Sequence, residues 1–266
     1  QYDLHLHTYW SYDATAQPEG HFKRAQALGL RCITITDHHV LDSLDDILEV
    51  AEDYPEIRTV PSAELTVTTS IGSVDLLCYG FSRPFSEDLK QVLAAYHEWQ
   101  RAQGAAVSGG LVALGLDFPD AERFRLLETY RPQKAIDVQG STHVRGGVMR
   151  QYCVDRGWVE SPEDTAELMR RAGKAVGFPR YPAVADVIPA VKAAGALVAI
   201  AHPRGYFNEC DRGRMDALRL ECQLDGIECA HPGVPEELTP VYRQYCEDHG
   251  LFSTGGSDCH TEEDIA

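Results

Sequence analysis

The chain has 266 residues, of which 44% are hydrophobic and 24% charged, so it can form one or two domains with a packed core. Its 24 Lys and Arg residues against 41 Asp and Glu residues give a formal charge of −17, which argues against a basic surface for long nucleic acid or an anionic membrane. No apolar run approaches the length of a membrane span and no signal peptide is visible. We therefore expect a cytoplasmic protein whose eight cysteines, none in a C-x-x-C pair, remain reduced.

Short runs rich in β-branched residues alternate with helical patterns in the first and last parts of the chain. The sequence predicts strands over 2–6, 32–35, 58–60, 73–79, 197–201, 226–229 and 251–253. It predicts helices between them over 18–28, 43–54, 183–194 and 236–249. Strand and helix in repeated order indicate parallel strands joined by crossover helices.

Residues 84–177 interrupt this alternation, because the sequence there predicts helices over 86–103, 120–130, 143–156 and 161–172 and no strand. Ser86 and Ser161 are suitable N-caps, and Pro162 follows the second of them. We therefore expect an α/β barrel body formed by residues 1–83 and 178–266, with a helical insertion over 84–177 that caps the substrate.

Metal-binding residue types gather where the predicted strands end. His5 and His7 are two residues apart on a strand, so both side chains point to the same face and can reach one ion. The other candidates each lie near the end of a predicted strand: Asp13, His38, Glu64, His202, Asp258 and His260. In a barrel of parallel strands these ends meet on one face, and this mixture of imidazoles and carboxylates suits Zn, Mn or Fe.

A single histidine after a strand is more often an ordinary polar residue than a ligand. Five histidines lack this placement or lack partners, and for most of them we expect a structural role: His21, His39, His97, His231 and His249.

Five motifs in order then resemble the polymerase and histidinol phosphatase (PHP) family: H-x-H near the start, T-D-H, a Glu after the third strand, A-H-P, and G-S-D-x-H near the end. The resemblance spans nearly the whole chain and implies a distorted seven-stranded (β/α) barrel with two or three divalent ions. It implies one ion held by His5, His7, Glu64 and Asp258. Glu64 would bridge to a second ion bound by His202, and Asp13, His38 and His260 would hold a third.

The chain departs from the family pattern in its predicted fourth strand. Where members have a His in a V-H-L-L-G-Y-G pattern, this chain has Asp75. A carboxylate can bind the same ions but is a harder ligand, and a structural pairing of Asp75 with an Arg is the alternative. The first motif also differs, because residues 11–14 read S-Y-D-A where many members have S-D-G; Asp13 is still a better candidate than Asp3.

The insertion resembles that of family members that act on nucleotides. Those proteins often carry an Arg on the first inserted helix and an R-P-H-like motif at the start of a later one; Arg101 fits the first, and His143 takes the place of the His in the second. Arg and His side chains suit a phosphate or ribose above the ions. Arg204, two residues after His202, could also reach a phosphate. Each of the three has an ordinary alternative, as a solvated surface residue or a structural residue at a helix start.

The expected function is a metal-dependent phosphoesterase that hydrolyses a phosphomonoester of a small nucleotide, such as a nucleoside 3′,5′-bisphosphate, or of short oligonucleotide ends. A hydroxide bridging two ions would attack phosphorus, while His143, Arg101 and Arg204 would stabilise the developing charge. The alternatives are histidinol-phosphate hydrolysis, C–N hydrolysis of the amidohydrolase type, and a non-catalytic metal-binding module. The sequence leaves the metal, the general acid and the oligomeric state open.

Overall fold

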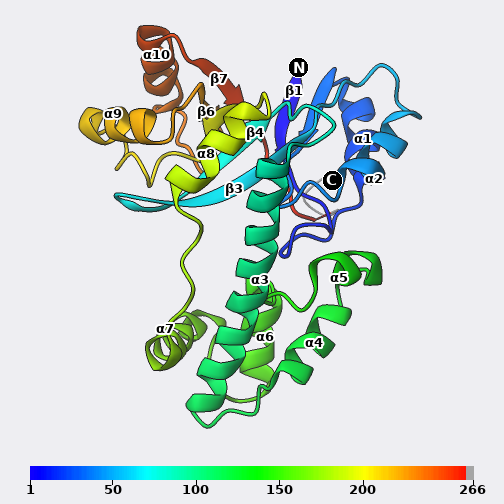
Figure 1. Ribbon diagram of the computed structural model, residues 1–266, viewed down its shortest axis with the longest axis vertical. Helices are drawn as coiled ribbons and strands as arrows, with labels where there is room; N and C mark the ends of the chain where they lie inside the picture. The colour runs from blue at the N-terminus through cyan, green and yellow to red at the C-terminus, as the bar shows by residue number, and fades with distance from the viewer. Residues whose placement is uncertain (262–266) are drawn as a thin grey trace.

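A computed structural model of the protein describes residues 1–261 (Figure 1). Its strands form two sheets, one with β1 parallel to β2 and one with β3 to β7 side by side in chain order. Single bridges from Leu6 to Cys259 and from His38 to Glu64 connect the two sheets. The strands are β1 (Tyr2–Leu6), β2 (Cys32–Ile35), β3 (Ser62–Thr69), β4 (Gly72–Tyr79), β5 (Leu197–Ile200), β6 (Gly226–Ala230) and β7 (Phe252–Gly255).

Helices flank both sheets, as Figure 1 shows: α1 (Pro18–Leu28) and α2 (Leu44–Ala51) lie beside the two-stranded sheet, and α8 (Val184–Ala193), α9 (Arg212–Glu221) and α10 (Thr239–His249) lie beside the larger one. Their positions confirm the predicted mixed α/β class, and α9 is a helix that the sequence pattern did not predict. The main apolar core lies between the larger sheet and its helices, and a smaller one lies between β1, β2, α1 and α2.

The predicted third strand was wrong. Arg58 makes only an isolated bridge to Cys32, and the strand instead covers Ser62–Thr69. It forms an antiparallel hairpin with β4, whose first residue, Gly72, has a φ of 120° that strongly favours glycine. β4 is also antiparallel to β5, so the expectation of parallel pairing throughout fails at this hairpin.

Six helical segments fill the region between β4 and α8: α3 (Glu87–Ala113), α4 (Asp120–Glu128), α5 (Gln133–Gln139), α6 (Gly146–Asp155), a 3₁₀ turn (Pro162–Asp164) and α7 (Thr165–Val176). Helix α3 starts beside the sheets and extends away from them, and α4, α6 and α7 lie around its distal half (Figure 1). These helices share an apolar cluster of their own, formed by residues between 107 and 178.

Helix α3 ends ten residues later than predicted, because its glycines serve close packing rather than helix termination. A Cβ atom on Gly104 would lie 2.6 Å from the Thr142 carbonyl oxygen, and one on Gly110 would lie 2.7 Å from that of Ala172. The predicted caps are confirmed: Ser86 accepts a hydrogen bond from the Leu89 amide, and Ser161 forms a capping box with Asp164.

Two further differences concern this helical region. Helix α5 was not predicted, and the helix predicted from residue 143 begins at Gly146, which leaves His143 in the preceding loop. Among residues 1–261, no helix has the length and apolarity needed to cross a membrane.

Candidate metal centre

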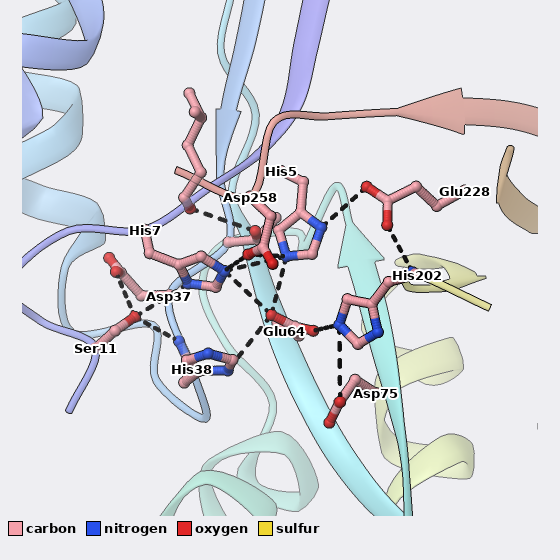
Figure 2. A network of polar contacts seen from close by, with 12 residues as sticks. His5, His7, Ser11, Asp37, His38, Glu64, Asp75, His202, Glu228 and Asp258 are labelled. Atoms are coloured by element: carbon pink, nitrogen blue, oxygen red, sulfur yellow. Dashed lines mark hydrogen bonds and ion pairs between the residues drawn. The ribbon is translucent and has the colours of Figure 1, made fainter. Parts of the chain in front are cut away.

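His5 in β1 and His7, the residue directly after β1, form the base of the site. His5 and His7 are fully buried, and their Nε2 atoms lie 3.0 Å apart (Figure 2). The alternation of side chains along the strand places both on the same face, as the H-x-H spacing predicted. Two imidazole nitrogens facing each other at this distance favour a shared cation between them.

Glu64 lies at the centre of the cluster, where it contacts four imidazoles. Its Oε2 atom is 3.0 Å from His5 Nε2, 3.2 Å from His7 Nε2 and 3.4 Å from His38 Nδ1. Its Oε1 atom is 3.2 Å from His202 Nε2. The sequence placed Glu64 after the third strand, but it is the third residue of β3, so the carboxylate comes from within the sheet (Figure 2).

Asp258 closes the first group of ligands. Its Oδ1 atom lies 3.2 Å from His5 Nε2 and 3.1 Å from His7 Nε2. The donor atoms of His5, His7, Glu64 and Asp258 all lie within 4.8 Å of one another, so one ion could contact all four. This is the first set that the family resemblance implied.

A second group lies on the other side of His7. Asp13 Oδ2 is 3.4 Å from His38 Nε2 and 3.5 Å from His260 Nε2, and the His7 ring stacks on His38 and on His260 at 4.3 and 4.2 Å. Asp13 Oδ1 and His38 Nδ1 are buried and make no hydrogen bond to the described residues. Buried polar atoms of this kind point to a ligand that satisfies them.

Asp75 and His202 form a third group with Glu64. The donor atoms of these three residues lie within 4.8 Å of one another, and Asp75 Oδ2 is 3.8 Å from His202 Nε2 (Figure 2). The hydroxyl groups of Thr66 and Tyr206 each donate a hydrogen bond of 2.6 Å to the Asp75 carboxylate. Asp75 is therefore held by hydroxyl groups rather than by an Arg.

Further residues orient these side chains, and sequence reasoning missed them. The buried Glu228 holds His5 Nδ1 at 2.9 Å through Oε1 and accepts the His202 backbone N–H through Oε2 (Figure 2). Ser11 contacts His7 Nδ1 at 3.2 Å and donates to Asp37. Carboxylates and hydroxyls behind metal-binding imidazoles fix their tautomer and orientation.

His231 was expected to be structural, but it lies at the site, with Nε2 3.3 Å from Asp258 Oδ2. Its signal in the sequence is its position directly after β6 (Gly226–Ala230), which the predicted strand ended one residue too early to show. The donor atoms of His5, Glu228 and His231 also lie within 4.8 Å of one another.

The backbone is shaped to bring these groups together. His202 and Asp258 adopt φ values of 29° and 56°, an uncommon conformation for residues other than glycine that is often found at functional sites. Gly256 allows the end of β7 to lie against β1, because a Cβ atom there would be 2.3 Å from His5 Cβ. The donor set of imidazoles and carboxylates fits divalent Mn, Fe or Zn.

The site has strongly shifted pKa values. Burial would lower the pKa of His5, but the Glu64 carboxylate raises it well above the ordinary value. Burial likewise opposes the shift at His38, where Asp13 and Glu64 raise the pKa to about 10. In return, and against the effect of burial, His5 holds the pKa of Glu64 well below its usual range, and the pKa of Asp258 is lowered by His231 and His7.

These shifts predict how the stability of the metal-free protein depends on pH. Raised imidazole pKa values stabilise the fold below about pH 6.5, and that contribution is lost as the pH rises toward 10. Lowered carboxylate pKa values stabilise it above about pH 4, and that contribution is lost at lower pH. With a metal chelator present, the melting temperature should therefore fall between pH 6.5 and 9. With Mn²⁺ present it should stay constant or rise over the same range, because protons compete with the ion for the imidazole and carboxylate ligands. Parallel curves with and without the ion would contradict this.

The candidate substrate residues lie at different distances from the cluster. The His143 ring lies 4.0 Å from the Tyr12 ring, and Tyr12 lies 5.4 Å from His38, so His143 stands one ring away from the ligands. Arg101 is exposed and donates to the Gln139 carbonyl oxygen, and Arg204 is exposed and paired with Glu209. The structure thus brings His143 near the cluster and turns both arginines toward other partners.

The remaining histidines have other partners. His21 is bound to the His7 carbonyl oxygen, which supports β1 from behind, and His39 is bound to Thr66 among the rings of Tyr96, Trp99 and Tyr181. His97 and His249 face Asp42 and Asp216 at the surface.

Comparison with known proteins gives one partial match to a protein family. Residues 3–98 match the family model for the PHP domain. None of the curated protein sequences matches the chain.

The chain shares its fold with several solved structures, among them the following three. A protein titled "putative metal-dependent phosphoesterase" from Bifidobacterium adolescentis is 24% identical, with a TM-score of 0.71 over 97% of this chain and 87% of that one. An amidohydrolase from Chromobacterium violaceum, solved with sulfate and without metal, is 22% identical, with a TM-score of 0.74 over 98% and 87%. A two-domain protein from Bacteroides vulgatus with a predicted PHP-like metal-dependent phosphoesterase is 16% identical, with a TM-score of 0.51 over 98% and 52%. The N-terminal third of the chain thus matches the PHP domain, and the chain as a whole shares the fold of these three structures.

Proposed function

We propose that the protein is a metal-dependent phosphoesterase that releases phosphate from a phosphomonoester of a small nucleotide. The observation that carries the proposal is the buried cluster around Glu64, whose carboxylate belongs to two candidate groups of ligands and contacts His38 of a third. The phosphoesterase names of two solved structures with this fold support the same reaction class.

Each of three groups of ligands could hold one ion. His5, His7, Glu64 and Asp258 would hold the first, Glu64, Asp75 and His202 the second, and His7, His38 and His260, beside Asp13, the third. Divalent ions bound there would neutralise phosphate oxygens and activate a water molecule as the nucleophile. Glu64 belongs to two of the groups, so it would be a ligand common to two ions, while Glu228 and Ser11 keep the His5 and His7 rings in place.

His143 is the side chain outside the cluster best placed to meet the substrate. Burial lowers the pKa of His143 to about 4, so its imidazole is neutral near pH 7 and can form hydrogen bonds without carrying charge. Arg101 and Arg204 would have to exchange Gln139 and Glu209 for a phosphate oxygen. A small phosphorylated substrate also suits the acidic chain, since positive charge at the phosphate would come from the ions.

C–N hydrolysis is the second candidate, because one structure with the same fold is named an amidohydrolase. Imidazole and carboxylate ligands of the same kind could activate water toward an amide carbon. Histidinol phosphate as the substrate, or a metal-binding role without catalysis, would also be compatible with the cluster.

Metal analysis and a substrate panel test the proposal together. We expect two or three Mn, Fe or Zn ions per chain and phosphate release from nucleoside bisphosphates or monophosphates in preference to sugar phosphates, histidinol phosphate and short RNA. Assays with amide and amidine substrates run in parallel. Phosphate release from none of the panel would overturn the proposal, and ammonia or amine release would favour the second candidate.

A further inference from the structure

A cavity of about 660 Å³ lies between α3, α6 and α7 of the helical region. Its walls are largely apolar, with Val107 from α3, Met149 from α6, Met169 from α7 and Phe178 beyond it. Pockets of this volume typically hold small organic molecules, and a phosphate group alone would leave most of it empty.

The cavity borders the candidate metal centre at two aromatic side chains. Tyr12 and His143 both line it, and their rings lie 4.0 Å apart. Tyr12 precedes Asp13 and lies 5.4 Å from the His38 ring. A molecule with its phosphate at the cluster could therefore extend past Tyr12 into the cavity.

Three lining residues carry buried polar atoms that make no hydrogen bond to the described residues. They are Gln103 Oε1, His143 Nδ1 and Thr165 Oγ1. Thr165 is only 3% exposed, so bulk water has little access to its hydroxyl. Polar atoms buried without a partner are costly, and they mark places where a ligand can supply the missing hydrogen bonds.

We infer that this cavity holds the planar heteroaromatic base of the substrate, with Gln103 and Thr165 bonding to its edge. Apolar walls suit the faces of such a ring, while an amide oxygen and a hydroxyl suit its mixed donors and acceptors. An alkyl chain would leave these polar atoms unpaired, and a bare sugar would place its hydroxyls against the apolar walls. Arg150 and Glu163, both exposed, bring opposite charges to the lining, so the cavity favours a neutral group. The inference relies on the proposed function for the phosphate end of the same molecule.

The test measures base binding separately from catalysis. Adenosine, which has no phosphate, should bind the protein in ligand-observed NMR, which detects millimolar affinities, and inorganic phosphate, which would occupy only the cluster, should not displace it. Val107→Trp should weaken adenosine binding at least about tenfold by filling the cavity. Val112→Trp, on the same helix but 50% exposed and outside the cavity, is the matched control and should bind as the wild type does.

Thr165→Val separates recognition from folding. It removes an unpaired buried hydroxyl with little change in shape, so the melting temperature should stay the same or rise, while adenosine affinity should fall about two- to tenfold. A lower melting temperature with unchanged affinity would show that the hydroxyl serves the fold instead.

The two proposals fail in different ways. Adenosine binding that Val107→Trp abolishes, without phosphate release from any substrate, would overturn the phosphoesterase and leave the base pocket. Equal kcat/KM for adenosine 5′-monophosphate and ribose 5-phosphate, unchanged by Val107→Trp and without adenosine binding, would overturn the base pocket and leave the phosphoesterase.

Discussion

Glu64→Gln is expected to lower kcat/KM for phosphate release by at least a hundredfold and to reduce the bound metal to one ion or none. Glu64 contacts the imidazoles of four histidines and is the ligand that two of the candidate groups share. Outer residues that only orient a ligand contribute about 10–100-fold to metal affinity or activity, so a carboxylate at the centre should contribute more. The glutamine keeps the size of the side chain but removes its charge, so the loss reports on charge rather than on a cavity.

Glu128→Gln is the matched control, because Glu128 is exposed at the end of α4 and undergoes the same chemical change. It should retain both metal and activity. Metal content by mass spectrometry, measured beside kcat/KM, separates ligand loss from unfolding. Full metal content in a folded Glu64→Gln protein would contradict the bridging role.

The sequence contained enough information to predict most of the residues that the structure brings together in the candidate site, because its strongest signals are local. The H-x-H spacing alone fixes His5 and His7 on one face, and strand ends in regular α/β order bring distant residues such as His202 and Asp258 together. His202 and Asp258 lie close to His5 in the structure, although they are about 200 positions or more away from it in the sequence.

The features that the sequence did not predict depend on antiparallel strand pairing and on residues that hold the candidate ligands in place. Thr66 and Asp75 are directly opposite each other in the β3–β4 hairpin, which parallel pairing would not allow. Glu228 is an acid inside an apolar strand, and only the position of His5 Nδ1 beside it reveals its function. In the helical region, Gly104 and Gly110 resemble helix breakers until their close packing is seen.

The acidic composition also takes on a more specific meaning. Several of the acids are buried at the cluster, including Glu64 and Glu228, and three divalent ions would bring the formal charge from −17 to about −11. The ions would then concentrate positive charge at the cluster, while the rest of the protein keeps a net negative charge. This distribution favours a small anion that fits the site over a long polyanion that must cross the surface.

Asp75 stands where the family pattern has a His, which predicts a different metal preference for this group. Replacing Asp75 should therefore have the second large effect on metal binding and activity. Its carboxylate lies beside His202 and is held by the hydroxyls of Thr66 and Tyr206. An oxygen ligand is harder than an imidazole, so this group should favour Mn²⁺ over Zn²⁺ more than an imidazole in the same place would. We expect Asp75→His to raise the Zn²⁺/Mn²⁺ affinity ratio about tenfold or more, measured by competitive metal titration, and to shift activity in the same direction.

Asp75→Ala should weaken one metal site and lower activity about 10–100-fold, because it removes a ligand and leaves two hydroxyl groups without their acceptor. Asp137→Ala, on the exposed face of α5, is the control for both measurements. If Asp75→Ala kept its metal content and lost only thermal stability, the carboxylate would serve the hairpin by binding Thr66 and Tyr206. If Asp75→Ala lost metal and Asp75→His regained it with a preference for Zn²⁺, the position would be a ligand whose identity sets the choice of ion.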